Sequence, residues 1–245
     1  MVRPRGRLAL PPSPTYHKRI VPSTYQSVAD RPLRRDAREN RERILVAARL
    51  AFAEVGIDVS VEEIARRAGV GMGTLYRRFP TKDALIDAVF EQHLDQIAGS
   101  AEAALADPDA WTAFLDYLTD IVRLQANDCG LSQMLGAHLS AEALVARART
   151  RLRPLVQQLI ENAQAAGELR SDVLYEDISV LLWTTGRVVD ATREIDPDFW
   201  QRYLALAIDG LRASGATPLP RPPLTAAKHR QAMTRFAEHR VRTFR

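Results

Sequence analysis

The sequence contains one cysteine, Cys129, in 245 residues. A single thiol cannot form an intrachain disulfide, and it excludes zinc sites built from several cysteines. We expect Cys129 to be a buried, inert thiol, with a redox sensor as the alternative. The five histidines show no close metal-ligand spacing, and no G-x-S-x-G nucleophile motif occurs. The residues therefore predict neither an enzyme nor a metal or cofactor site.

Long apolar runs are also missing. The longest candidate, ISVLLWTTGRVV at 178–189, is interrupted by Arg187 and is much shorter than the roughly 20 apolar residues that a spanning helix needs. The first 19 residues carry arginines but no apolar segment of the kind a secretion signal requires. We therefore expect a cytoplasmic protein with no membrane contact, associated with the nucleoid if it binds DNA.

No segment shows a strand pattern, whereas apolar residues recur at helical spacing along most of the chain. The pattern predicts an all-α fold. Pro154 should bend or restart the helix in which it falls. The expected helices cover 38–55, 60–68, 71–79, 81–97, 109–126, 131–138, 140–166, 173–192 and 198–213, and a short basic helix is possible within 225–245.

Charge and proline divide the chain into four parts. Residues 1–35 hold eight basic and one acidic residue with several prolines, which predicts a disordered basic arm. Residues 36–83 hold nine basic and eight acidic residues, and residues 84–215 hold ten basic and twenty acidic residues. A second basic extension covers 216–245, with seven basic residues and one acidic. A nucleic acid should therefore contact the ends of the chain, although basic tails that only aid solubility are an alternative.

The stretch GVGMGTLYRRF at 69–79 has three glycines at alternate positions. A phosphate-binding loop would follow a buried strand, but the preceding SVEEIARRA predicts a helix that begins at a Ser60 N-cap. Glu63, three residues later, completes the pattern of a capping box. Gly69 is then expected as a left-handed C-cap between two short helices, which favours a helix-turn-helix.

The second short helix has the side chains of a reading element. Thr74, Tyr76 and Arg77 can contact thymine methyls, phosphates or guanine edges, and Gly71 and Gly73 permit a close backbone approach. Lys82 combines a cation with the N–H groups at a helix start. Phe79 is expected in the core, and a core position is also the alternative for Tyr76.

Residues 41–85, RERILVAARLAFAEVGIDVSVEEIARRAGVGMGTLYRRFPTKDAL, resemble the DNA-binding region of the tetracycline-repressor (TetR) family of bacterial regulators. The resemblance implies an all-helical homodimer. In each subunit it implies a three-helix DNA-binding domain, here residues 36–83, joined to a larger ligand-binding and dimerisation domain, here residues 84–215. It also implies a regulator, in most members a repressor, that a small effector releases from operator DNA. The family often has lysine or arginine at the position of Met72, so base preference does not carry over. The candidate DNA contacts are Ser60, Met72, Gly73, Thr74, Tyr76, Arg77, Arg78, Lys82 and Arg43.

The segments QANDCGLSQML and GELRSDV resemble the SbtR-like branch of this family. The resemblance places the dimer interface on the last two long helices, whose apolar positions are Ile178, Leu181, Leu182, Val189, Leu204, Ile208 and Leu211. Candidates for the effector site are Trp111, Phe114, Tyr117, Met134, His138, Trp183 and Arg187, with ordinary core packing as the alternative. Arg187 could pair with Asp190 or with a ligand carboxylate, or lie on an exposed face. An architectural DNA-binding protein without an effector is the alternative function.

Overall fold

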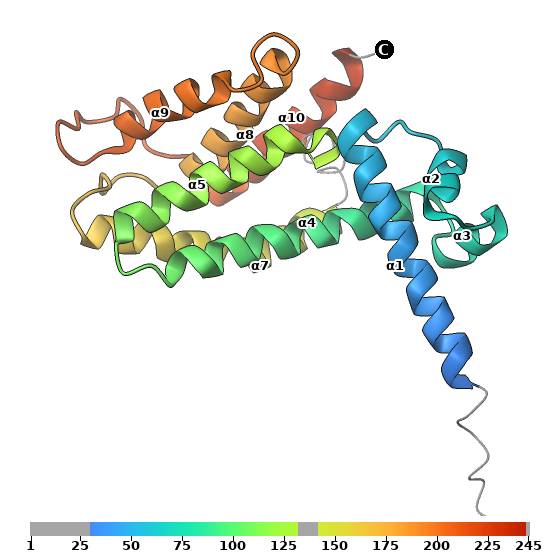
Figure 1. Ribbon diagram of the computed structural model, residues 1–245. Coiled ribbons are helices and arrows are strands. Elements are labelled where there is room, and N and C mark those ends of the chain that lie inside the picture. Colours follow the sequence, from blue (N-terminus) through green and yellow to red (C-terminus); the bar gives the residue numbers. More distant parts are fainter. Residues whose placement is uncertain (1–29, 132–141, 244–245) are drawn as a thin grey trace, which may run out of the picture. The chain divides into compact units, whose positions relative to one another are not determined.

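The computed structural model describes residues 30–131 and 142–243. The chain divides between Arg38 and Glu39, and the core and the sites described below lie in the second unit, Glu39–Arg245. Its regular elements over the described ranges are helices (Figure 1). None of these helices combines the length and the apolar character that crossing a membrane requires. The predicted all-α fold class is confirmed.

In the second half of the chain, the helices begin and end within about two residues of the positions that the sequence predicts. The described residues also contain one isolated antiparallel bridge, between Leu169 and Arg212. The helices are α1 (Asp30–Val55), α2 (Val61–Ala68), α3 (Met72–Arg78), α4 (Lys82–Leu105), α5 (Ala110–Asn127), α7 (Glu142–Ala165), α8 (Tyr175–Thr192), α9 (Phe199–Leu211) and α10 (Ala226–Thr243).

The start of α1 differs from the prediction. The helix begins at Asp30 rather than Arg38, so residues 30–35, expected in a disordered arm, are helical. Pro32 does not prevent this because it lies in the first turn, where no backbone N–H is needed for the helical hydrogen bonds. The rest of the predicted arm, residues 1–29, lies outside the described residues.

Two other predictions concern the middle of the chain. The helix α7 continues through Pro154 as one element, so the proline does not restart it. Val156, Leu159 and Ile160 after the proline are buried in the core, and this packing holds the helix together across the missing hydrogen bond. The helix predicted at 131–138 lies outside the described residues except for Leu131, which is helical.

The first apolar core joins α1, α2 and α3 to the beginning of α4 (Figure 1). The helices α2 and α3 are too short to be stable alone and depend on this packing. Residues that α1 contributes recur three or four positions apart, which places them on one face of the helix. The fully buried members include Ile44, Leu45, Ala48, Phe52, Ile64, Leu75, Leu85 and Val89.

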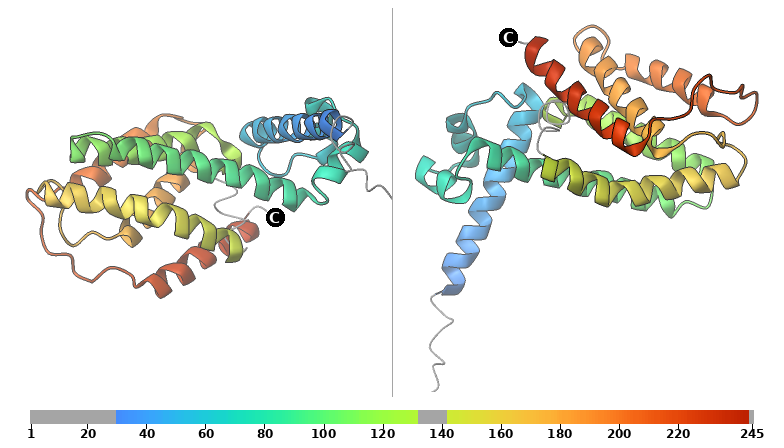
Figure 2. Two further views of the ribbon diagram at one scale, coloured as in Figure 1. Left: turned by 90° about the horizontal axis from the view of Figure 1, so that it is seen from below. Right: turned by 180° about the vertical axis from the view of Figure 1, so that it is seen from behind.

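The second core lies farther along α4. There α4 packs on α5 and α7, while α8 packs on α5 and α9, and Figure 2 shows these helices from two further sides. A small third cluster joins Val122, Val189, Trp200 and Leu204. The second core includes Ile97, Ala101, Phe114, Leu118, Ile121, Leu159, Ile160 and Ile178.

The two cores meet where α5 ends. Gly130 lies directly against α1, because a Cβ atom there would approach the Phe52 backbone carbonyl oxygen to 2.9 Å. Beside it, the buried side chains of His93 on α4 and Asp128 join through a 2.8 Å hydrogen bond, and Asp128 also accepts the N–H of Leu131. The end of α5 is therefore fixed to both α1 and α4.

Candidate nucleic-acid interface

The helix α2 begins as the sequence predicts. Ser60 has extended backbone angles, and its Oγ accepts the N–H of Glu63 at 3.2 Å. The carboxylate of Glu63 binds the guanidinium groups of Arg66 and Arg67, at distances of 2.6 to 2.8 Å. These two partners lower the pKa of Glu63 to about 2. Of the two hydrogen bonds of a capping box, the one from the Glu63 N–H to Ser60 Oγ is present. The Glu63 carboxylate binds the two arginines instead of the Ser60 N–H.

The turn between α2 and α3 also follows the prediction. Gly69 has φ of 63° and ψ of 39°, the left-handed conformation that glycine adopts without strain. The N–H of Val70 donates to the carbonyl of Ala65 at 3.1 Å, which closes the end of α2. The chain then changes direction within three residues, and α3 starts at Met72.

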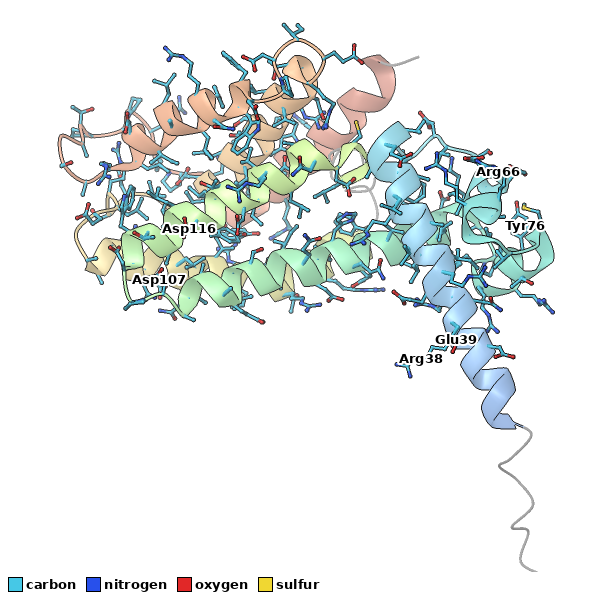
Figure 3. The ribbon with its side chains drawn as sticks, viewed as in Figure 1. Arg38, Glu39, Arg66, Tyr76, Asp107 and Asp116 are labelled. Carbon is cyan, nitrogen blue, oxygen red and sulfur yellow. The ribbon has the colours of Figure 1, made fainter. Side chains whose placement is uncertain are left out.

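One face of α3 packs and the other is exposed. Leu75 is buried in the first core, and Phe79 directly after the helix is buried as well, so its predicted core position is confirmed. Tyr76 is 44% exposed and lies on the outer side of α3 (Figure 3). The neighbouring side chains of Arg77 and Arg78 are also exposed. A core position for Tyr76 is therefore wrong.

The start of α3 offers backbone and small side chains. A Cβ atom at Gly71 or Gly73 would meet no atom of the chain within 4 Å, so both glycines border open space. The guanidinium of Arg77 folds back along the helix and donates to the Gly73 carbonyl and to Thr74 Oγ1, each at 3.1 Å. Thr74 and Met72 are half-buried, and Met72 packs against the first core.

Other predicted DNA contacts lie at helix ends. Ser60 starts α2, and Lys82 is the first residue of α4, where Thr81 Oγ1 accepts the N–H of Ala84 at 3.0 Å. Free N–H groups at such positions suit a phosphate. Arg43 behaves differently, because its Nη2 donates to the backbone carbonyls of Ala68 and Gly69 at 2.7 and 3.0 Å.

The predicted effector residues are spread over the second part of the molecule. Trp111, Phe114 and Tyr117 are buried in the second core, where burial raises the pKa of the Tyr117 hydroxyl. Trp183 is half-buried on α8, and the guanidinium of Arg187 lies 5.6 Å from the centre of its ring. The remaining two candidates, Met134 and His138, lie outside the described residues.

Two outcomes in the same region concern charged groups. Arg187 pairs with Asp190 at 2.7 Å, which confirms one of its two predicted partners. The His93–Asp128 pair was not predicted. Its signal in the sequence is the position of His93, four residues after Val89 on the apolar stripe of α4, which implies burial. A buried histidine requires a polar partner, but the sequence does not show that Asp128 supplies it.

Two family descriptions match the chain. Residues 44–89 match "Bacterial regulatory proteins, tetR family", and residues 109–213 match "Transcriptional regulator SbtR-like, C-terminal domain". The first match covers the helix-turn-helix and the beginning of α4. The second covers the helices from α5 to α9.

Individual proteins give the same result. A TetR transcription regulatory protein from Mycobacterium vanbaalenii is 37% identical with a TM-score of 0.55, over 74% of this chain and 99% of that one. A TetR transcriptional regulator from Streptomyces coelicolor is 33% identical with a TM-score of 0.50, over 70% and 98%. An HTH-type transcriptional regulator from Staphylococcus aureus (strain USA300) is 45% identical over 64 residues, or 26% of this chain. The chain matches only 35% of that curated relative's length.

Proposed function

Because the chain belongs to the TetR family of bacterial transcriptional regulators, we propose that it is a repressor that binds a palindromic operator as a homodimer. A small-molecule effector would release it from the operator. The protein would work in the cytoplasm at the nucleoid, without a cofactor or catalytic activity. The observation that carries this proposal is the exposed face of α3, where Tyr76, Arg77 and Arg78 project beside the open backbone of Gly73.

The chemistry of this face suits the major groove. An arginine can bind guanine O6 and N7 with two hydrogen bonds, and the Tyr76 hydroxyl can reach a phosphate. Arg77 donates two hydrogen bonds, from Nε to Gly73 and from Nη2 to Thr74, and these neutral acceptors can be exchanged for a base edge when DNA is present. The N–H groups near Ser60 and Lys82 would hold the phosphates on either side.

The dimer would form through α8 and α9. Of the residues that the sequence suggested for the interface, Ile178, Val189, Leu204 and Leu211 are buried within the subunit, whereas Leu181, Leu182 and Ile208 are half-buried and remain accessible to a partner. Leu206 on α9 is 62% exposed instead, and is the strongest apolar candidate for the contact between subunits.

The effector would enter the second part of the molecule. Trp183 and Arg187 are the more accessible of the predicted contacts, because both are half-buried on α8. Trp111, Phe114 and Tyr117 would need the second core to open before they could touch a ligand. A ligand carboxylate near Arg187 would have to compete with Asp190.

Genomic SELEX with the purified protein, followed by a mobility-shift assay on the selected site, tests the proposal. We expect an inverted repeat with two equivalent half-sites. Enrichment of bent or AT-rich DNA without a repeat would indicate the architectural function instead. No enrichment at all would show that this protein does not read DNA by sequence.

A further inference from the structure

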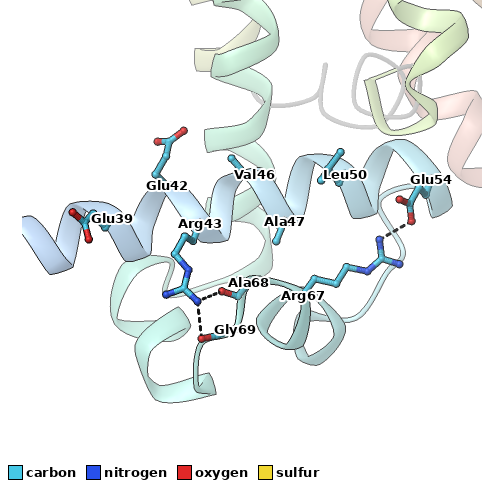
Figure 4. A pocket seen from close by; sticks show the side chains of 10 residues that line it. All are labelled: Glu39, Glu42, Arg43, Val46, Ala47, Leu50, Glu54, Arg67, Ala68 and Gly69. Atoms are coloured by element: carbon cyan, nitrogen blue, oxygen red, sulfur yellow. Dashed lines mark hydrogen bonds and ion pairs between the residues drawn. The ribbon is translucent and has the colours of Figure 1, made fainter.

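Two arginine contacts join α1 to α2, one at each end of a groove between the helices (Figure 4). At one end Arg43 of α1 donates to the carbonyls of Ala68 and Gly69. At the other end Arg67 of α2 pairs with Glu54 of α1 at 2.6 Å. Apolar side chains of α1 line the groove between the two contacts. The crossing of α2 over α1 is therefore fixed at two points.

The Arg43 contact ends on carbonyls that α2 itself cannot use. The last carbonyls of a helix have no intrahelical partner and carry the negative end of the helix dipole. A guanidinium group there forms charge-assisted hydrogen bonds and satisfies two carbonyls at once. A Cβ atom at Gly69 would lie 2.7 Å from Arg43 Nη2, so the guanidinium occupies the space that the glycine leaves.

The position of this turn determines where α3 points. The helix α3 has seven residues, and Leu75 is its only buried one. Leu75, the half-buried Met72 and the buried Phe79 directly after the helix hold α3 against the first core, and a polar contact at the preceding turn restricts its direction further. Arg43 supplies this contact. It binds the carbonyl of Gly69, three residues before α3 begins at Met72.

We propose that Arg43 is a positioning residue, which sets the angle of the recognition helix and so determines base discrimination without contacting phosphate. This inference rests on the proposed DNA-binding function. It differs from a role as a DNA contact because the guanidinium is directed at the protein, with Nη2 donating to the two carbonyls and Nη1 donating to Asn40 Oδ1 at 3.4 Å.

The test compares wild type with Arg43→Gln, Arg43→Lys and the matched control Arg66→Gln. Arg66 is a highly exposed arginine of the same domain that binds Glu63 within α2. Binding to the SELEX operator and to singly substituted operators is measured by fluorescence anisotropy across a salt series. Circular dichroism at the assay temperature verifies that each variant is folded.

We expect Arg43→Gln to reduce the affinity ratio between the operator and its substituted forms about tenfold, the scale of one misaligned base contact. The slope of affinity against salt, and non-specific affinity, should stay at the wild-type values. Arg43→Lys should behave like Arg43→Gln, because an ammonium group lacks the planar fork that spans two carbonyls. Arg66→Gln should retain the wild-type ratio.

A uniform loss across all sequences, with a slope reduced by about one in Arg43→Gln, would make Arg43 a phosphate contact and overturn the proposal. Wild-type discrimination in Arg43→Lys would do the same, since charge alone would then suffice. If Arg43→Gln fails to fold, Arg43→Lys decides alone. Failure of the wild type to select any operator would instead contradict the proposed function.

Discussion

At the scale of single residues, Gly69 has a left-handed backbone conformation that glycine adopts without strain. Its φ of 63° costs other residues roughly 1–2 kcal/mol. We expect Gly69→Ala to lower the free energy of unfolding by about that amount, measured by urea denaturation. Gly73→Ala is the matched control, because Gly73 lies inside α3 beside open space. Alanine should be neutral or stabilising there, by up to about 1 kcal/mol. Equal stability of Gly69→Ala and wild type would contradict this account of the turn.

The exposed residues of α3 make a second prediction at this scale. Replacing Tyr76 or Arg77 by alanine should weaken operator binding by about 1–3 kcal/mol and leave helicity unchanged, since both side chains project away from the core. Arg123→Ala on α5 is the control, because Arg123 is an exposed arginine that pairs with Asp120 in its own helix. Anisotropy titrations on one operator measure all three variants. If Arg77→Ala binds as tightly as Arg123→Ala, Arg77 does not contribute to reading.

Prediction from sequence succeeded where a residue acts through its chain neighbours. Ser60 capping its own helix, Gly69 ending it, and Arg187 pairing three residues along α8 all follow from local spacing. It failed where the partner lies elsewhere in the fold. The two carbonyl acceptors of Arg43 are 25 and 26 residues away, and no local pattern connects them, so its contacts with the α2–α3 turn could not be predicted.

At the scale of elements, the terminal helix α10 is held by a buried histidine. His229 is 8% exposed, and its ring lies edge-on to Tyr175 of α8, 6.3 Å between centres. Burial lowers its pKa, and Glu176, Asp177, Arg153 and Arg230 add smaller effects of both signs. The sequence suggested a possible helix here, and the helix exists over Ala226–Thr243. Its packing through His229 could not be predicted, because no local pattern connects His229 with Tyr175, 54 residues earlier in the chain.

This packing should depend on pH. A histidine whose pKa is lowered in the packed state binds a proton more readily when α10 is detached. Packing should therefore be strongest above the ordinary histidine pKa near 6.5. It should weaken as the pH falls from there to the lowered pKa, with no further loss below it. Hydrogen exchange of α10 amides, corrected for the intrinsic pH dependence, measures this. His229→Phe should remove the pH dependence, and the same dependence in both proteins would assign it to another group.

Sequence patterns located the helices but did not show what their apolar residues pack against. The apolar residues of α8 and α9 recur at helical spacing in the sequence, which predicts one apolar face for each helix. Whether Ile178 and Leu204 face the subunit core or a partner depends on how the two helices rotate against each other. The same holds for Trp111 and Phe114, which are buried in the second core. Periodicity gives the face of a helix and leaves its partner undetermined.

At the scale of the whole molecule, the charge of the body bears on how the proposed dimer would meet DNA. Residues 81–215 carry eleven basic and twenty-one acidic side chains, so this part repels DNA and should turn away from it. A dimer formed through the body would then present two copies of α3 to one side of the duplex. Two equivalent half-sites in an inverted repeat would follow from that symmetry.

The dimer can be tested at Leu206 without disturbing the core. Leu206→Glu should give a monomer by size-exclusion chromatography with light scattering, because the charge would be buried in the proposed interface while the side chain is exposed in the subunit. Operator affinity should fall about 100-fold or more, since two linked half-site contacts become one. Leu219→Glu places the same charge at a similarly exposed leucine beyond α9 and should leave the dimer intact. A dimeric Leu206→Glu protein that binds the operator normally would move the interface to another surface. Loss of the dimer with unchanged operator affinity would mean that single subunits read DNA, and the palindromic operator would then lose its structural reason.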